Sequence, residues 1–329
     1  MIKKVFATLT LGLFMCSCMA QAPVEPAKVY FTSEITPESL LAVFKALGVE
    51  PQGKVAVKIS TGESSQSNQL SPELIGTLVK EVNGTLVECN TAYKGNRSDT
   101  ESHRKAIAER GYDKIAEVDI MDADGEMLLP MQDSTYFDNN IVGKHLANYD
   151  FMINLAHFKG HQMGGFGGVL KNQSIGVASA DGKGLIHSAG LSNKAKDAFM
   201  TPKNGQDGFL ESMAGAAQSV DTYFKHKKGI VYIDVMNNMS VDCDCNGHPA
   251  SPVLKDMGIL ASLDPVALDQ ACLDLVFNHK PAEGDDNAPL IERIQTRHGT
   301  HTVDYAEKIG LGTKKYVIID LDKAVDSQK

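Results

Sequence analysis

Short apolar segments of strand type alternate along most of this chain with segments whose apolar residues recur at helical spacing. Residues 55–59 are an apolar run of strand length, and the next segment, 71–82, begins with a serine and a proline in helix-starting positions. Such alternation is typical of a sheet whose strands are joined by crossover helices. We therefore predict an α/β fold, a mostly parallel or mixed sheet with helices on both faces. The predicted strands cover 28–31, 55–59, 85–89, 151–156, 229–234, 259–262 and 316–320, and the predicted helices cover 36–47, 71–82, 99–110, 208–224, 265–277, 289–297 and 303–309.

The chain has 329 residues, which is long for a single hydrophobic core. We predict either one α/β domain over residues 29–322 or two intimate subdomains that divide near residue 150. The stretch 179–202 has no clean period, which favours a functional loop there.

Residues 1–20 have the layout of an export signal, because two lysines precede an apolar run too short to span a membrane. Ordinary secretory cleavage would follow Ala20, whereas a lipoprotein-type signal would make Cys18 the lipidated residue; we favour Cys18. Residues 21–28 would then form a short tether. We expect an exported protein, either in the periplasm or held at the membrane as a lipoprotein. The lipid anchor at Cys18 is the only membrane contact expected.

The net charge of the chain constrains its partners. A formal charge of −9 argues against a protein that binds the phosphate backbone of nucleic acids. Tryptophan is absent and aromatic residues make up only 6%, so base stacking has little support either. Local basic clusters still permit an anion to bind. We therefore predict a small anionic ligand and no nucleic-acid partner.

Residues 154–176 bring histidine, lysine and glycine together in one short stretch. His157 and His161 are four residues apart, so both imidazoles could reach one metal ion. Alternatively, the glycines let backbone N–H groups approach an anion, with charge added by Lys159 and Lys171. A third alternative is a turn whose histidines bond backbone carbonyls. The expected cofactor-binding residues are Lys159, Gly164, Gly165, Gly167, Gly168 and Asn172.

A second cluster, residues 242–248, contains Cys243 and Cys245, separated by a single residue, among carboxylates and a histidine. Two thiols can bind a soft metal together with imidazoles, and mixed nitrogen and sulfur ligation fits zinc or iron. The alternatives are a disulfide formed in an oxidising compartment, or a solvated acidic turn. We assign Cys89 and Cys272 to the core. The predicted metal ligands are His157, His161, Cys243 and Cys245.

Polar residues follow several of the predicted strands, at the sheet edge where α/β proteins place their ligand sites. Glu63 belongs to the segment that follows the predicted strand 55–59, and Lys58 lies near the end of that strand. We predict both, with Lys171, as the catalytic residues for acid–base chemistry. Arg97 and His103 lie beyond another strand. They either bind a carboxylate or phosphate or belong to a solvated helix face.

Six sequence blocks, each present once, follow one another along the chain. They are VKISTGE (57–63), TAYKGNRSDTESH (91–103), INLAHFKGHQMGGFGGVLKNQSIG (153–176), DCDCNG (242–247), GILASLDPVALDQACLDLV (258–276) and YAEKIGLG (305–312). These blocks resemble the bacterial and archaeal family called domain of unknown function 362, often labelled uncharacterised iron–sulfur centre proteins. The resemblance implies that the histidine loop, the Lys171-Asn172 pair and the two cysteines form one family pattern. Many relatives carry a ferredoxin-like segment with four-cysteine runs, and this chain has no C-x2-C-x2-C run.

These observations predict an exported metal-binding α/β protein, an enzyme that acts on a small anionic substrate with the help of a zinc or iron ion. A non-catalytic, lipid-anchored protein that binds a small molecule is one alternative. An electron-transfer protein with an iron–sulfur cluster is the other, and it follows from the family resemblance rather than from the cysteine spacing.

Overall fold

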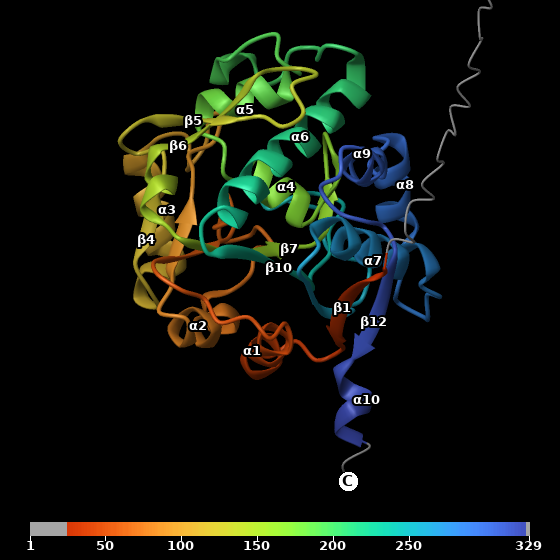
Figure 1. The fold of residues 1–329 in the computed structure, drawn as a ribbon. Coiled ribbons are helices and arrows are strands. Elements are labelled where there is room, and N and C mark those ends of the chain that lie inside the picture. Colours follow the sequence, from red (N-terminus) through yellow and green to blue (C-terminus); the bar gives the residue numbers. More distant parts are fainter. Residues whose placement is uncertain (1–24, 327–329) are drawn as a thin grey trace, which may run out of the picture.

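An eight-stranded sheet forms the centre of the molecule in the computed structural model, which describes residues 25–326 (Figure 1). The strand order is β12-β1-β11-β10-β7-β2-β3-β4. Only β11 runs antiparallel to its two neighbours within these residues, and all other neighbouring pairs are parallel. The α/β prediction is therefore confirmed. The strands are β1 Ala27–Thr32, β2 Val55–Lys58, β3 Thr85–Glu88, β4 Val118–Ile120, β7 Phe151–His157, β10 Gly229–Met236, β11 Gly258–Ser262 and β12 Tyr316–Asp320.

Helices cover both faces of this sheet, with α1 and α2 on one side and α4, α6 and α7 on the other (Figure 1). Two small antiparallel pairs, β5–β6 and β8–β9, lie outside the main sheet. The helices are α1 Pro37–Ala46, α2 Pro72–Glu81, α3 Thr100–Arg110, α4 Val169–Ser174, α5 Ala180–His187, α6 Gly205–Lys225, α7 Pro265–Asn278, α8 Ala288–Thr296, α9 His301–Lys308 and α10 Leu321–Asp326. The small strands are β5 Glu126–Pro130, β6 Asn139–Gly143, β8 Lys159–His161 and β9 Gly165–Gly167.

Alternate residues of each strand pack into two separate hydrophobic cores, as a sheet covered on both faces requires. In β2, Val55 and Val57 belong to the core beneath α1 and α2, whereas Ala56 belongs to the core beneath α4, α6 and α7. Lys58 follows with the parity of Ala56, and it is 1% exposed at the carboxyl end of the strand. The sheet thus buries an ammonium group on the same side as α4.

The structure adds elements that hydrophobic periodicity does not reveal. The hairpin β8–β9 and the short helix α4 lie in the glycine-rich stretch, and α5 lies inside residues 179–202. Glycine and polar side chains fill these segments, so their apolar residues do not repeat at a helical or strand period. Strands from before and after residue 150 share the one sheet, because β7 pairs with both β2 and β10.

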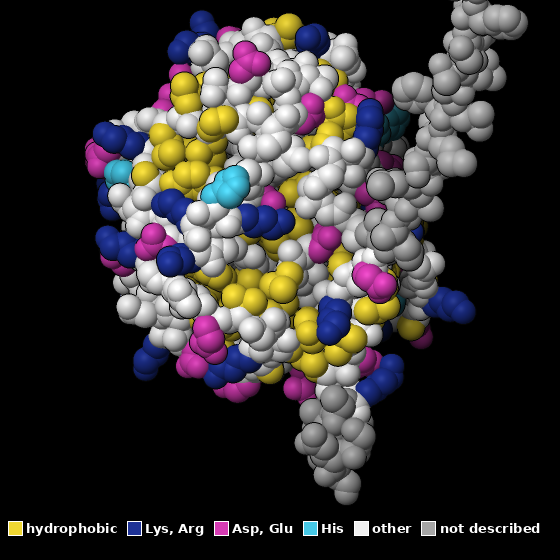
Figure 2. All heavy atoms as spheres, viewed as in Figure 1, with side chains coloured by type: hydrophobic (Ala, Val, Ile, Leu, Met, Phe, Trp, Pro, Cys, Tyr) yellow, Lys and Arg dark blue, Asp and Glu magenta, His cyan; other side chains and the backbone are white. Residues whose placement is uncertain are grey.

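The surface carries acidic and basic side chains interspersed over the face shown in Figure 2. No helix of the described residues is long and apolar enough to cross a membrane. The predicted signal over residues 1–20, with Cys18 and Ala20, lies outside the described residues, as do residues 21–24 of the predicted 21–28 tether. The last two residues of that tether, Ala27 and Lys28, belong to β1 instead.

Candidate functional site

A cavity of about 300 Å³ opens at the carboxyl ends of β2 and β3, beside the β8–β9 hairpin. This is the sheet edge at which the sequence predicts a ligand site. The charged lining is mainly basic, with cations outnumbering carboxylates. The cations are Lys58, Arg97, Lys159, Lys171 and Lys183, the carboxylates are Glu88 and Asp244, and two histidines, His161 and His187, complete the set.

Arg97 is 3% exposed, so it does not lie on a solvated helix face. Its Nη1 lies 2.5 Å from Glu88 Oε1 and its Nε lies 3.3 Å from Glu63 Oε2. Burial opposes ionisation of Glu88, but Arg97 and His103 outweigh it and hold the pKa of that carboxyl well below its usual range. The arginine charge is therefore matched inside the protein.

Glu63, predicted as catalytic, supports Arg97 rather than lining the cavity. One of its carboxylate oxygens also accepts a hydrogen bond from the Tyr93 hydroxyl at 3.2 Å, and the other accepts from the Asn96 backbone N–H. The Glu63 backbone N–H donates to the Asp244 carbonyl oxygen at 2.8 Å. The residue thus joins the loop after β2 to the loop that carries the cysteines.

Lys58 lines the floor of the cavity and is held by Asn172, a predicted binding residue. Its ammonium donates to Asn172 Oδ1 at 3.1 Å and to the Ile59 carbonyl oxygen. The Asn172 amide donates in turn to Asn154 Oδ1 at 2.7 Å, which fixes its orientation. Burial, only partly offset by Glu88, lowers the pKa of Lys58 to about 8.

His157 and Lys159 share one partner, the buried carboxylate of Asp244. His157 Nδ1 lies 2.8 Å from Asp244 Oδ1, and Nε2 lies 2.6 Å from the Asn237 carbonyl oxygen. Both ring nitrogens are therefore engaged, and neither is free for a metal ion. This corrects the four-ligand expectation, because His157 fixes the cysteine loop to β7 instead of joining His161.

The glycine-rich backbone does bind a carboxylate, but the carboxylate belongs to the chain itself. At the start of α4, the N–H groups of Val169 and Leu170 donate to Asp269 at 2.9 and 3.1 Å. A Cβ at Gly168 would overlap that carboxylate, so glycine is required for its approach. The expectation that this backbone cradles a ligand is thereby corrected for Gly168.

The other glycines of the stretch serve the hairpin. Gly165 has φ +82°, a left-handed conformation that favours glycine. A Cβ at this position would also lie only 2.8 Å from the Gly299 Cα. Gly164 donates its backbone N–H to His161 Nδ1 at 2.8 Å. Gly167 lies close to Lys159 and Lys171, since an added Cβ would meet their side chains at 3.6 and 3.8 Å.

Lys171 projects from α4 into the cavity, where it has no hydrogen-bond or ion-pair partner among residues 25–326. Burial and the neighbouring Lys159 ammonium lower the pKa of Lys171 to about 7, against the attraction of Asp244. A lysine with such a pKa is present in both protonation states near neutral pH. It is thus suited to proton transfer as well as to anion binding.

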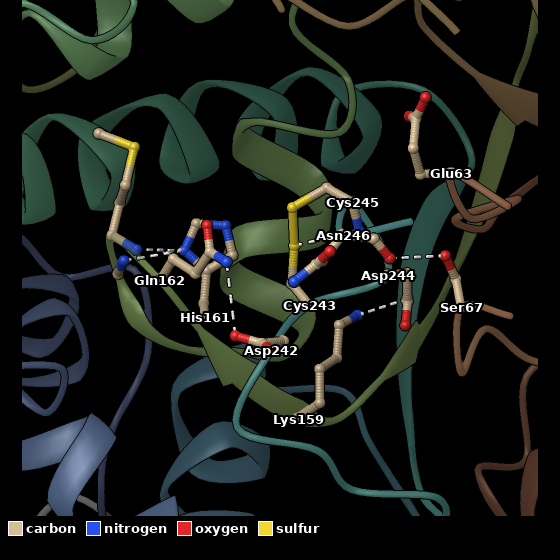
Figure 3. The surroundings of a disulfide bond; sticks show 12 residues. Glu63, Ser67, Lys159, His161, Gln162, Asp242, Cys243, Asp244, Cys245 and Asn246 are labelled. Carbon is tan, nitrogen blue, oxygen red and sulfur yellow. Dashed lines mark hydrogen bonds and ion pairs between the residues drawn. A yellow bond between two sulfur atoms is a disulfide. The ribbon is translucent and has the colours of Figure 1, made fainter. Parts of the chain in front are cut away.

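Cys243 and Cys245 form a disulfide beside His161 (Figure 3). One ring nitrogen of His161 and the two sulfurs lie within 4.8 Å of one another, so these three residues form a possible metal-binding group. Metal ligation needs thiolates, and the disulfide withholds them. Among residues 25–326 the remaining cysteines, Cys89 and Cys272, are buried in the core as predicted.

The protonation of His161 follows from its backbone contacts. Its Nδ1 accepts N–H groups from Met163 and Gly164, at 3.3 and 2.8 Å. Burial and the nearby Lys171 ammonium hold the pKa of His161 well below its usual range, so the ring is neutral. A neutral imidazole whose Nδ1 accepts carries its hydrogen on Nε2. His161 Nε2 therefore presents an N–H donor and not a lone pair.

Two cavity residues, Lys183 and His187, have no counterpart in the sequence predictions. Both lie on α5, and the ammonium of Lys183 donates to the Ala178 carbonyl oxygen at 2.6 Å. His187 Nδ1 is buried without a hydrogen-bond partner, and burial lowers the pKa of His187 to about 3. Their i, i+4 spacing was the available signal, within the stretch predicted only as a functional loop.

A family model described as domain of unknown function (DUF362) matches residues 55–274, which include β2, the glycine-rich stretch and the cysteine loop. No curated protein sequence matches the chain.

Two solved structures resemble the fold distantly. One is a protein from Thermotoga maritima, with 10% identity and a TM-score of 0.40, covering 84% of this chain and 59% of that one. The other is the lactate racemase apoprotein from Thermoanaerobacterium thermosaccharolyticum, with 13% identity and a TM-score of 0.36, covering 64% of this chain and 50% of that one. This chain thus spans between half and three fifths of the length of either protein.

Proposed function

The chain belongs to the DUF362 family, whose description names no reaction, and we propose that it is an enzyme acting on a small anionic substrate. The substrate would bind in the cavity at the carboxyl ends of β2 and β3. Lys171 would meet its negative charge and exchange a proton with it.

The observation that carries this proposal is the lack of a partner for Lys171 among the described residues. Each other cation of the cavity has an acceptor: Lys58 has Asn172, Arg97 has Glu88, Lys159 has Asp244 and Lys183 has the Ala178 carbonyl. The Lys171 side chain is only partly buried, so its ammonium stays accessible from a cavity that four other cations line. An anionic ligand would supply the missing partner.

The cavity limits the size and chemistry of the ligand. A volume of about 300 Å³ suits a molecule of metabolite size. Carboxylate or phosphate oxygens would accept from the Lys171 ammonium, and the uncharged His187 ring could meet a neutral part of the same molecule. Phe199, which is 64% exposed, lies at the margin and could pack on the ligand's apolar part.

Isothermal titration calorimetry tests the proposal, with inorganic phosphate, oxalate, citrate and glycerol phosphate as probes. We expect at least one probe to bind the wild-type protein at pH 6 and to lose about tenfold or more in affinity in Lys171→Met, which keeps the stem and removes the charge. Lys194→Met is the matched control, because Lys194 is surface-exposed and pairs with Asp181. Equal affinities in wild type and Lys171→Met would contradict the proposal.

A metal-dependent form of this enzyme is a second candidate, favoured by the close grouping of His161, Cys243 and Cys245. A zinc or iron ion there would polarise a substrate oxygen or activate water beside the anion. Two thiolates must first be released by reduction, and His161 must present a lone pair. Elemental analysis after anaerobic reduction and reconstitution tests this. Less than about a tenth of an equivalent of either metal would contradict it, since sites of this kind bind tightly.

We also propose that the protein is exported and held at the membrane through a lipid on Cys18. The layout of residues 1–20 supports this. The Cys243–Cys245 disulfide supports it too, because disulfides persist mainly in oxidising compartments. Metabolic labelling with a radioactive fatty acid tests it. Wild type should be labelled and Cys18→Ala should not, and an unlabelled wild type would contradict it.

A further inference from the structure

The disulfide forms part of the cavity wall, and its two sulfurs differ in access. Cys245 lines the cavity and is partly exposed, whereas Cys243 is 1% exposed and does not line it. A small nucleophile that enters the cavity therefore meets Cys245 first. Purely structural disulfides are usually shielded from such attack.

The buried sulfur has a hydrogen-bond donor already in place. The backbone N–H of Cys245 lies 3.1 Å from Cys243 Sγ. The His161 ring, whose Nδ1 accepts the Gly164 backbone N–H, stands beside the same sulfurs (Figure 3). Donors of this kind stabilise a thiolate and so make Cys243 the better leaving group.

The loop that holds the cysteines does not depend on the sulfur–sulfur bond for its position. Its carbonyl oxygens at Asp244 and Asn246 accept from Glu63 N–H at 2.8 Å and from Ser67 Oγ at 2.7 Å. The Asp244 carboxylate is fixed by His157 and Lys159. None of these contacts involves sulfur, so the loop can keep its shape when the disulfide is reduced.

We propose that the Cys243–Cys245 disulfide is a redox-active centre that exchanges with a small dithiol entering the cavity, with Cys245 as the sulfur attacked. This activity is independent of the anionic substrate proposed above. Thiol–disulfide exchange transfers two electrons, which the lysine side chains of the cavity cannot do.

The exchange has two steps. A thiolate of the dithiol attacks Cys245 Sγ, the disulfide breaks, and its bonding electron pair leaves on Cys243 Sγ. The second thiolate of the dithiol attacks its own sulfur in the mixed disulfide and releases Cys245. The dithiol departs as a cyclic disulfide. Two electrons have passed to the protein, and the two protons of the dithiol end on Cys243 and Cys245.

Alkylation and peptide mass spectrometry of the native wild-type protein test the activity. In graded mixtures of reduced and oxidised dithiothreitol, Cys243 and Cys245 should pass reversibly between labelled and unlabelled forms. Cys89 and Cys272, 2% and 0% exposed, should stay unlabelled and so report that the fold is intact. A pair that stays oxidised in the native protein, at dithiol concentrations that reduce it in urea, would overturn the proposal.

A matched pair of variants tests the order of attack. Cys243→Ser leaves Cys245 as a free thiol on the cavity wall, and Cys245→Ser leaves Cys243 buried. With 4,4′-dithiodipyridine as the probe, Cys243→Ser should react about tenfold faster or more, since accessible thiols react first. Equal rates, or the reverse order, would overturn the assignment of Cys245. The wild-type measurement stands by itself if a variant does not fold.

Discussion

The Lys159 ammonium lies 2.9 Å from Asp244 Oδ2, and this ion pair ties the β8–β9 hairpin to the loop that carries the disulfide. His157 holds the other oxygen of the same carboxylate at 2.8 Å. Burial opposes ionisation of Asp244, but Lys159 and His157 outweigh it and hold the pKa of this carboxyl far below its usual range. The Asp244 carboxylate therefore pairs with His157 and Lys159, and it forms no ion pair with Lys171.

Replacing this carboxylate should destabilise the protein strongly. Asp244→Asn leaves the buried Lys159 ammonium without its counterion, and breaking a buried pair in this way costs about 3–5 kcal/mol. Urea denaturation followed by circular dichroism gives the change in the free energy of unfolding. Asp242→Asn is the control in the same loop, because its longer contact with Arg293, at 3.5 Å, should cost less than about 1 kcal/mol. Similar losses in both variants would contradict this account.

The stability of the protein should depend on the charge of Lys171. Its pKa is about 7 in the folded protein and near 10.5 when unfolded, so between these values the unfolded chain binds the extra proton. Stability from this group therefore rises with pH from about 7 to 10. Lys171→Met should remove that part of the slope, measured by urea denaturation at several pH values. An unchanged slope would show that Lys171 is not perturbed.

The affinity for an anion should fall as pH rises, whereas the stability contributed by Lys171 rises. Only the charged form of Lys171 pairs with an anion, and the charged fraction falls as pH rises through about 7. Apparent affinity for a bound probe should fall about tenfold between pH 6 and pH 8, in proportion to that fraction. Titration calorimetry with oxalate checks this, because oxalate keeps its charge over that range. A pH-independent affinity would exclude Lys171 as the partner.

The glycine-rich stretch should respond to substitution in a position-specific way. Gly168→Ala forces a Cβ against the Asp269 carboxylate that binds the start of α4, and should destabilise by about 1–3 kcal/mol. Gly167→Ala should be tolerated, since its new Cβ would lie 3.6 Å from the flexible Lys159 side chain. Thermal denaturation compares the two. Equal melting temperatures would contradict the role given to Gly168.

The sequence predicts the α/β sheet correctly, because apolar periodicity is a local property of each segment. It directs the search for a site to one sheet edge through a general rule about parallel strands. Thus Lys58 and Lys171, far apart in the chain, meet at the predicted edge. The partners of individual side chains are not local properties. His157 shows this: its spacing from His161 favours a shared metal, yet Asp244, 87 residues away, occupies it.

The same limit explains Gly168 and Cys243. A glycine-rich turn before a helix predicts an anion, and only the fold reveals that Asp269 provides it, 100 residues later. Two cysteines separated by a single residue fit either a metal site or a disulfide, and the sequence leaves both open. The structure joins Cys243 to Cys245, and it places His161 beside them, which no spacing rule relates to that pair.

A crystal structure of the protein soaked with selenate tests the central claim most directly, because anomalous scattering locates this anion without ambiguity. The account predicts a selenate oxygen at hydrogen-bond distance, about 2.7–3.2 Å, from Lys171 Nζ inside the cavity at pH 6. The same soak of Lys171→Met should leave the cavity without selenate. Selenate absent from the wild-type cavity, or bound there equally in Lys171→Met, would contradict it.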